Sequence, residues 1–433
     1  MKILKHIIVA ILTLEAKLIL KKYQPRIVAV TGSVGKTSTK EAIFCVLARK
    51  FNARRSEKSF NSELGVPLAV IGAPNAWYSV FGWLANIFAG LKLLVLRRPY
   101  PDILILELGA DRQGDIARLA DWVRPDIAVI TPIGEVPVHV EFFAGPEDVA
   151  QEKAKLAEAL TAKGTAVLNG DDLTVLEMRD KTTAKVITVG FGEDSMMRAS
   201  EYKLVARTGG SPAGGHPDGI TFKADYEGSS VPVRLHDVFG KQIVYAALSA
   251  LGVGVAMGMN LIEAAEALST YAAPAGRLKL IKGEKETWIL DDTYNASPLA
   301  AHAALDVLKD FPARRKLAVL GDMLELGKFT IEAHRAMADH AKECADIVFT
   351  VGPRAKFIAD ELSAHGFDAE KLQRFSSAEE AGHALEKIIQ PGDLILVKGS
   401  QSMRMERIVE EIMADPAEKE KLLVRQEPEW QGK

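Results

Sequence analysis

Apolar runs that end in small or polar residues recur along the first half of the chain, and each leads into a stretch with helical spacing. The runs are Arg26–Val30, Ile103–Leu106, Ile127–Thr131 and Ala166–Asn169. Short continuous apolar runs are typical of strands that are buried on both faces, and a helix after each gives a βαβ rhythm. This part of the chain therefore predicts a mostly parallel sheet covered by helices.

The middle of the chain, residues 186–235, changes to an alternation of apolar and polar residues. The segments ITFKADYEG and VPVRL alternate, and the stretch TGGSPAGGHPDG is rich in Gly and Pro. Alternation is typical of half-buried strands, so we expect small antiparallel strands and a mobile loop. Helical spacing resumes over Val244–Met257 and Leu261–Leu268.

A second α/β unit begins near Pro274. Four strand-like runs follow, WILDDTY, KLAVLGD, DIVFTVG and DLILVKGS, and each has helical material after it. We place the domain boundary within 272–277. After Asp415 the chain is charged and contains prolines, which predicts a loosely held end.

The N-terminal residues 2–22 carry apolar pairs at helical spacing, which predicts an amphipathic helix within 1–25. Its apolar run from Ile7 to Leu14 is too short to span a bilayer, and no small-residue cleavage site follows. Packing on the protein is the favoured interpretation, and a helix lying on a membrane surface is the alternative.

A second apolar stretch predicts a helical insert over 76–98. It has no charge from Ala76 to Leu91, with aromatic residues near its start and Arg97 and Arg98 at its end. Such a distribution is typical of an interfacial helix. Two interpretations stay open, namely contact with a membrane and a helix covered by protein.

Composition narrows the function classes only a little. A chain of 433 residues with 48% hydrophobic residues can form two or three well-packed domains. The net charge of -3 gives no broad basic field, so nucleic acid is not an expected partner. Cys45 and Cys344 are the two cysteines, and their small number favours a reduced, cytoplasmic compartment.

The sequence TGSVGKTSTKE, residues 31–41, lies between a predicted strand and a predicted helix. A glycine loop in that position points backbone N–H groups at phosphate, and the helix dipole adds to the attraction. Lys36 would bring positive charge to the terminal phosphates, and Thr37 would place its hydroxyl on Mg²⁺. The loop is shorter than the common form, since two residues rather than four separate Gly32 from Gly35.

This loop completes the predicted architecture, an α/β fold. Residues 26–274 are predicted to form a central P-loop ATPase domain with a mostly parallel sheet. Residues 275–415 are predicted to form a C-terminal Rossmann-like α/β domain, and 416–433 a charged tail.

Three further residues of the first domain are candidates for chemistry. Glu107 follows an apolar run, where open α/β sheets bind ligands, and could hold the metal together with Thr37. His139 alone is better interpreted as a hydrogen-bonded structural histidine. Lys153 alone is better interpreted as a lysine on a solvated helix face.

The second domain offers a polar loop, DDTYNASP, directly after a predicted strand. Its residues Asp292, Tyr294 and Asn295 fit a binding loop, and ordinary turn chemistry is the alternative. Arg277 could reach a phosphate from this domain, and a surface salt bridge is the alternative.

Together these segments resemble the Mur ligase family, and within it the branch that joins D-alanyl-D-alanine to a UDP-muramoyl tripeptide. The matching pieces are TGSVGKTSTKE, FNSELGVPL, LELGADRQGDIA, the helix around Lys153, AGRLK, LDDTYNASP, VLGDMLELG and LVKGSQSMRME. They stand in the family's order and run from about residue 13 to 415. The resemblance implies an ATP-dependent amide ligase of cell-wall precursor synthesis, with two Mg²⁺ sites.

The resemblance also implies a role for each matching residue. Lys36, Lys153, His139, Glu107 and Arg277 would be catalytic. The metal ligands would be Thr37, Glu107, His139 and Lys153, the last in carbamylated form. ATP would be bound by Thr31, Gly32, Ser33, Gly35, Lys36, Thr37, Ser38, Gln242, Arg277, Asp292, Tyr294 and Asn295. Substrate would be contacted by Asn61, Asp322, Glu325 and Lys398.

Some features depart from the family's pattern. The phosphate loop begins at residue 31, so we expect the family's N-terminal UDP-binding domain to be lacking. The adenine-seating motif is replaced by a stretch with Gln242, and Gln401 stands where an arginine is common. These departures suggest a lipid-linked donor or a separate UDP- or substrate-binding partner. They also suggest a cytoplasmic enzyme with peripheral membrane contact through 1–22 and 76–98.

Two other functions stay open at this point. A related ligase could act on another polymer, as in folylpolyglutamate, cyanophycin or MurT-type enzymes, although two cysteines argue against a MurT-type zinc insert. A non-catalytic nucleotide-binding scaffold is disfavoured, because Lys36, Thr37, Glu107, His139 and Lys153 are all present. The carboxylate donor, the amine and the oligomeric state are left undetermined.

Overall fold

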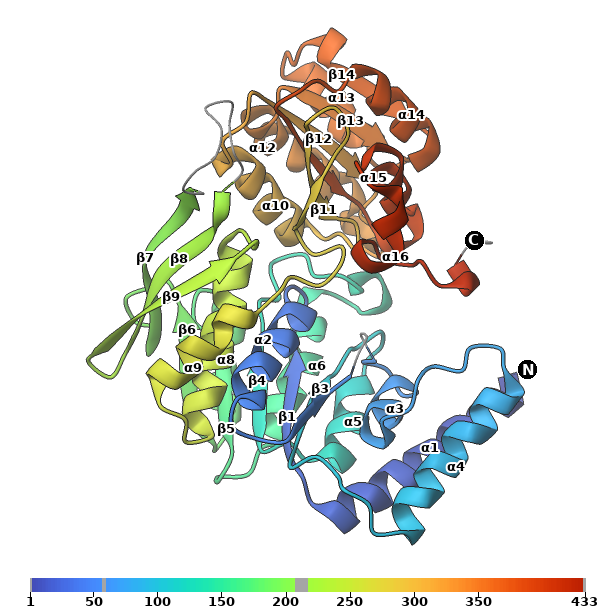
Figure 1. Ribbon diagram of the computed structural model, residues 1–433, viewed down its shortest axis with the longest axis vertical. Coiled ribbons are helices and arrows are strands. Elements are labelled where there is room, and N and C mark those ends of the chain that lie inside the picture. The colour runs from blue at the N-terminus through green and yellow to red at the C-terminus, as the bar shows by residue number, and fades with distance from the viewer. Residues whose placement is uncertain (1, 57–59, 207–216, 431–433) are drawn as a thin grey trace.

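The computed structural model describes residues 2–56, 60–206 and 217–430. Most of the Gly/Pro-rich stretch expected to be a mobile loop, 208–216, lies outside these residues. Two lobes follow one another along the chain, each built on its own sheet (Figure 1). The expected α/β class, with mostly parallel sheets, is confirmed.

The first lobe is built on a sheet of nine strands within the described residues. Their spatial order is β2 (Ala53–Arg55), β3 (Ile103–Glu107), β1 (Arg26–Thr31), β4 (Ile127–Ile130), β5 (Thr165–Asn169), β6 (Lys185–Gly190), β7 (Met197–Ala206), β8 (Pro217–Tyr226) and β9 (Ser229–His236). The pairs from β2 to β7 are parallel, and β7, β8 and β9 pair antiparallel. β1 lies between β3 and β4 and is parallel to both. The loop after β1 therefore lies at the carboxyl edge of these strands, where α/β folds bind ligands.

Helices cover both faces of this sheet because the central strands are apolar on both sides. One face packs against α2 (Lys36–Ala48), α8 (Lys241–Ala256) and α9 (Leu261–Ala267). The other face packs against α1 (Lys2–Tyr23), α3 (Gly65–Ile71), α4 (Val80–Val95), α5 (Asp115–Val123), α6 (Pro146–Glu158) and α7 (Leu173–Leu176).

The second lobe has a sheet of six strands within the described residues. Their order is β10 (Lys279–Lys282), β11 (Trp288–Asp292), β15 (Asp393–Lys398), β12 (Arg315–Gly321), β13 (Ile347–Val351) and β14 (Leu372–Phe375). All pairs are parallel except β10 with β11. The helices are α10 (Pro298–Asp310), α11 (Thr330–Arg335), α12 (Met337–Cys344), α13 (Lys356–Ala364), α14 (Ala378–Ile388), α15 (Glu406–Ile412) and α16 (Lys419–Leu422).

The two apolar segments form a pair of helices, α1 and α4, that lie side by side at the edge of the first lobe (Figure 1). One face of α1 packs inward, with Leu12, Ala16 and Ile19 fully buried. The ammonium of Lys22 donates hydrogen bonds to the carbonyls of Leu93, Leu94 and Leu96, which stabilises the C-terminal end of α4. In the part of the chain that the structure describes, no helix is long and apolar enough to cross a membrane.

Candidate active site

The phosphate loop joins β1 to α2 at the carboxyl edge of the first sheet. Gly32 has φ of 138°, and a Cβ at this position would lie 2.0 Å from Oγ1 of Thr131, so the strand end leaves space only for glycine. Gly35 has φ of 84° and caps α2 in the left-handed conformation. The resulting turn leaves the N-terminal end of a 13-residue helix open toward a cavity, which is a favourable place for phosphate.

Lys36 begins α2 and folds back over this loop. Its ammonium donates a hydrogen bond to the Gly32 carbonyl at 2.8 Å. Burial lowers the pKa of Lys36, and the positive charge of Arg277 lowers it further, while the carboxylates of Glu107 and Asp111 oppose the shift. The Lys36 ammonium thus lies near the carboxylates of Glu107 and Asp111. A phosphate oxygen could take the place of the Gly32 carbonyl as its hydrogen-bond acceptor.

Thr37, Glu107 and Asn61 form a buried polar group beside the loop. The Thr37 hydroxyl donates to Oε2 of Glu107 at 3.2 Å, and the Asn61 amide donates to Oε1 at 3.3 Å. Glu107 is 1% exposed and ends β3, next to β1 in the sheet. A hydroxyl and a carboxylate together are an oxygen donor set that suits Mg²⁺.

His139 faces both lobes. Its Nδ1 lies 2.6 Å from Oε2 of Glu325 in the second lobe, and its Nε2 lies 3.9 Å from Oδ1 of Asp111. The contact with His139 lowers the pKa of the Glu325 carboxyl. Because Glu325 comes from the other lobe, this pair joins the two lobes at the cavity.

Lys153 lies on the inner face of α6, where it is 2% exposed. Burial lowers its pKa to about 7, and the nearby charge of Lys36 acts in the same direction. The interpretation from the residue alone, a lysine on a solvated helix face, is therefore wrong. A buried amine with such a pKa is about half neutral at neutral pH, and the neutral form is nucleophilic.

The second lobe contributes Arg277 and the loop after β11. The Arg277 guanidinium stacks on the Tyr294 ring at 4.0 Å and donates to the Thr37 hydroxyl at 3.5 Å. Behind this contact, the ammonium of Lys398 lies 2.5 Å from Oδ2 of Asp292 and donates to the Asn295 carbonyl at 3.0 Å. Arg277 is thereby aimed across the gap between the lobes at the phosphate loop.

Lys36, Asn61, Glu107, His139 and Arg277 meet around a cavity of about 300 Å³, whereas Thr37 and Lys153 are not part of its lining. Its lining is Ser33, Val34, Lys36, Asn61, Glu107, Asp111, Val138, His139, Arg277, Tyr294, Asn295, Ala296, Ser297, Ala300 and Gln401. The hydroxyl oxygen of Ser33 is buried there and has no hydrogen-bond partner among the described residues. An orphaned hydroxyl beside a cationic loop fits an anionic ligand such as a nucleotide phosphate.

Other predicted site residues lie outside this lining. Thr31 donates to the Leu108 carbonyl at 2.9 Å beneath the loop, and Ser38 is buried on α2. The side-chain oxygen of Gln242, at the start of α8, is buried without a partner among the described residues. Asp322 accepts hydrogen bonds from the backbone N–H groups of residues 354 and 355, a structural task in the second lobe.

The sequence interpretation missed Asp111 and the tail residue Arg425. Asp111 stands four residues after Glu107 in the same polar loop, and that spacing was the available signal. Arg425 is in contact with the loop after β11, although 131 residues separate it from Tyr294. No local sequence pattern indicates such a contact.

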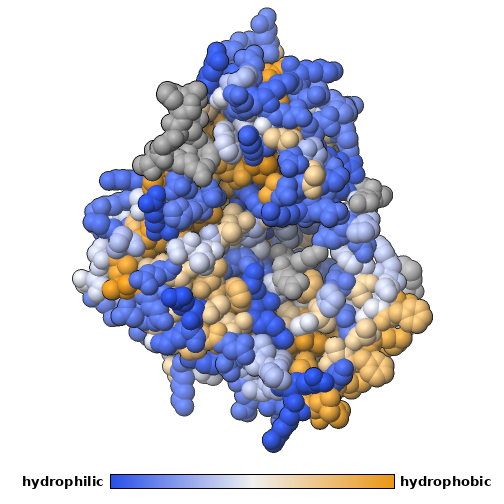
Figure 2. Space-filling view, in the orientation of Figure 1, coloured by the Kyte–Doolittle hydropathy of each residue, from blue (hydrophilic) through white to orange (hydrophobic). Residues whose placement is uncertain are grey.

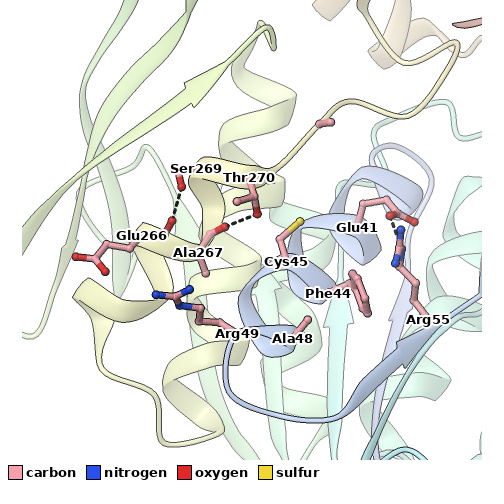
Figure 3. Close-up of a pocket in the computed structure, with 11 residues that line it drawn as sticks. Glu41, Phe44, Cys45, Ala48, Arg49, Arg55, Glu266, Ala267, Ser269 and Thr270 are labelled. Atoms are coloured by element: carbon pink, nitrogen blue, oxygen red, sulfur yellow. Dashed lines mark hydrogen bonds and ion pairs between the residues drawn. The ribbon is translucent and has the colours of Figure 1, made fainter.

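A larger cavity of about 710 Å³ lies elsewhere on the first lobe, between α2, β2 and α9 (Figure 3). Its polar groups are largely bonded to neighbours: Ser269 and Thr270 donate to helix carbonyls, and Arg55 pairs with Glu41. None of the lining residues belongs to the candidate site. The smaller cavity, which brings charged groups from both lobes together, is the better candidate.

The fold and the smaller cavity define a two-lobed P-loop nucleotide-binding protein. Two family models match the chain, the Mur ligase middle domain over residues 30–254 and the Mur ligase, glutamate ligase domain over residues 276–401. The chain belongs to the Mur ligase family of ATP-dependent ligases. The predictions from the sequence, that the chain is a Mur ligase and an ATP-dependent ligase with a phosphate loop, are thereby confirmed.

Individual relatives are similar over most of their length. The UDP-N-acetylmuramoyl-tripeptide--D-alanyl-D-alanine ligase of Bacillus subtilis (strain 168) is 29% identical over 403 residues, 93% of this chain and 79% of the relative. MurF from Acinetobacter baumannii superimposes with a TM-score of 0.76 at 27% identity, covering 94% of this chain and 81% of that one. MurF from Thermotoga maritima, solved in complex with ADP, gives 0.75 at 25% identity, with 93% and 83% covered.

Proposed function

We propose that the chain catalyses the reaction in the names of these relatives, joining D-alanyl-D-alanine to a UDP-muramoyl tripeptide at the expense of ATP. A carboxylate oxygen of the tripeptide attacks the γ-phosphorus, and the bond to ADP breaks. The dipeptide amine then attacks the acyl carbon, and phosphate leaves with the electron pair of the C–O bond. The amine proton passes to phosphate or solvent, and an amide remains.

The residues around the cavity suit this chemistry. Lys36 and Arg277 bring two positive charges to the transferred phosphoryl group from opposite lobes, and such pre-placed charges are a major source of transition-state stabilisation. Thr37 and Glu107 would hold Mg²⁺, which would neutralise phosphate charge. The observation that carries the proposal is the contact of Arg277 with Thr37, because it joins the lobes at the phosphate loop.

We further propose that Lys153 is carbamylated and, with His139, forms a second metal site. The neutral amine attacks CO₂ and releases one proton, which turns a neutral side chain into an anionic carbamate with oxygen ligands. The lowered pKa of Lys153, about 7, supports this step because only the unprotonated amine reacts. Asp111 lies near both His139 and Lys153 and adds a further oxygen donor.

The reaction is tested by measuring phosphate release with ATP, a UDP-muramoyl tripeptide and D-alanyl-D-alanine, with mass spectrometry of the products. We expect release only when all three are present, together with one UDP-linked product that is extended by the dipeptide. Glutamate and single D-alanine serve as control amines. Release with a single amino acid and not with the dipeptide would contradict the proposed acceptor and favour a ligase for another polymer.

We also propose that the outer face of α1 and α4 rests on an anionic membrane surface. Large apolar side chains are exposed along both helices, and they gather in one patch at the lower right of Figure 2. Its members are Ile7, Ile11, Leu14, Leu18, Val80, Phe81, Leu84, Phe88, Leu91 and Val95. Contiguous exposed patches of this kind are uncommon on monomers and mark an interaction surface.

The charges around this apolar patch favour lipid over a second copy of the chain. Exposed cations flank the patch, namely Lys5, Lys17, Lys21, Lys92, Arg97 and Arg98. The acid Glu15 of α1 is 4% exposed and turned toward Gly90 of α4. Anionic headgroups are attracted to such a cationic rim, whereas two like-charged rims would repel each other.

Vesicle flotation tests this docking. Phe81 and Phe88 are 85% and 69% exposed, so Phe81→Ser with Phe88→Ser should leave folding intact. We expect the pair to weaken binding to phosphatidylglycerol vesicles by about tenfold or more, since a buried aromatic side chain contributes roughly 1.5–3 kcal/mol. Leu173→Ser, at an equally exposed apolar residue on α7, is the matched control and should float like the wild type. Unchanged flotation of the double variant, or a patch-dependent dimer in solution, would overturn the proposal.

A further inference from the structure

Within the described residues, the charged tail is packed into the second lobe over 423–430 rather than loosely held. After the short helix α16, Leu423 is 4% exposed and Arg425 is 8% exposed. The Cγ1 atom of Val424 lies 2.9 Å from where a Cβ on Gly276 would stand. The chain after residue 422 therefore runs against the loop that carries Arg277.

Arg425 binds the backbone of the loop after β11. Its Nη1 donates to the Tyr294 carbonyl at 3.1 Å, and its Nη2 donates to the Thr293 carbonyl at 2.5 Å. Nη2 also lies 2.7 Å from Oε2 of Glu406, which is 1% exposed on α15. The guanidinium thus connects a buried acid on a helix to two successive carbonyls of the loop. It can do so because its planar group carries several N–H donors that point in different directions.

The next carbonyl of the loop, that of Asn295, accepts from the ammonium of Lys398. Three successive carbonyls therefore point at two buried cations, and this fixes the direction in which the loop presents its side chains. Tyr294 then stacks on Arg277, and Arg277 reaches Thr37. A shift of the loop backbone would carry Tyr294 with it and turn Arg277 away from the phosphate loop.

The same tail reaches the first lobe. The ring of Trp430 lies edge-on to that of Trp77, with centroids 6.3 Å apart. The Trp430 carbonyl accepts from Arg404 at 2.8 Å, and the Arg404 guanidinium lies 5.7 Å from the Trp430 ring. Trp77 lies three residues before the start of α4, so the tail spans from the loop after β11 to the edge of the other lobe.

We infer that Arg425 is a positioning residue of the active site, which acts by fixing the backbone of residues 293–295 and, through Tyr294, the guanidinium of Arg277. Trp430 anchors the far end of the same segment on the first lobe. The inference deepens the proposed function, because it concerns the same cavity. It depends on nucleotide binding there and not on the identity of the carboxylate or the amine.

The test compares Arg425→Met, which keeps the aliphatic stem, with Arg425→Lys, which keeps the charge. We expect Arg425→Met to raise the Kd of a non-hydrolysable ATP analogue about tenfold and to lower kcat by a similar factor, and Arg425→Lys to recover part of both. Arg407→Met is the matched control, because Arg407 pairs with Glu379 away from the loop. Its Kd and kcat should equal those of the wild type.

Thermal unfolding separates positioning from folding. All measurements are made well below the Tm of each variant. A lower Tm for Arg425→Met with wild-type analogue binding and kcat would overturn the inference, since a purely structural residue behaves in that way. If Arg425→Met does not fold, Arg425→Lys decides: a raised Kd in the folded protein supports positioning, and an unchanged Kd refutes it. Because analogue binding needs no acceptor, a wrong substrate assignment would leave this result unchanged.

Discussion

Replacing Lys36 by methionine is expected to lower kcat by about 10³-fold, with little change in the fold. The ammonium of Lys36 lies at the loop that would hold the terminal phosphates, and removal of one such preorganised donor typically lowers turnover by about 10²–10³. Methionine has a similar length, so α2 and the loop keep their packing. Phosphate release under saturating ATP is the measurement.

The stability of the Lys36 variant provides an internal check. Burial lowers the pKa of Lys36, so the native state holds this proton less tightly than the unfolded chain does, and the charged lysine destabilises the fold. Lys36→Met should therefore have an unchanged or higher Tm. Lys155→Met, at an exposed lysine on α6, is the control and should keep wild-type kcat. A Lys36→Met protein that retains a tenth or more of the wild-type kcat would contradict the assigned role.

The parts of the active site that follow a strand directly could be predicted from the sequence. Thr31 ends β1 and residues 32–37 follow it, while Glu107 ends β3, the neighbour of β1 in the sheet. Hydrophobic runs identify such strands, and the carboxyl ends of parallel strands meet at one edge. Local sequence patterns were therefore enough to predict this half of the site. They include Gly32, whose φ of 138° requires a glycine.

The contacts between lobes could not be predicted in this way. The contact of His139 with Glu325 joins residues far apart in sequence, and its partners are set by how the two sheets dock. Arg425 is a similar case, since a charged segment near a terminus is usually solvated. Its burial depends on Glu406 and on two loop carbonyls, none of which lies near it in the sequence.

Lys153 illustrates a third limit. The helix PEDVAQEKAKLAE has charged residues on most of its surface, so a lysine in it is expected to face water. The structure turns Lys153 and Glu152 inward, and Glu152 accepts hydrogen bonds from the backbone N–H groups of residues 114 and 116. Only the packing of α6 in the folded lobe reveals which of its charged residues are buried.

Lys153→Ala is expected to lower kcat by about 10²-fold or more, and formate should restore part of the loss. The side chain lies near Lys36 and Asp111, which line the cavity, and a small carboxylate can enter the space that alanine leaves and supply the oxygen atoms of the missing carbamate. Acetate, which is larger, should restore less. Carbon-13 NMR with labelled bicarbonate should give a carbamate signal in the wild type that is lost in the variant. Carbamylation would be contradicted if Lys153→Ala kept the wild-type kcat. It would also be contradicted if the wild type gave no carbamate signal and formate did not restore the activity of Lys153→Ala.

Stability should respond to Lys153 in the opposite sense to activity. The pKa of the free amine is about 7 in the native state, below the 10.5 of an ordinary lysine, so the native state binds this proton less tightly than the unfolded chain. The resulting destabilisation is complete below pH 7 and disappears as the pH rises toward 10.5. In CO₂-free buffer Lys153→Met should therefore raise the free energy of unfolding by about 3–5 kcal/mol near pH 6, and by much less near pH 10. Denaturant unfolding at both pH values measures this difference, and Lys155→Met should show none. An equal effect at both pH values would mean that the methionine acts through packing and that the buried charge of Lys153 does not limit the stability of the fold.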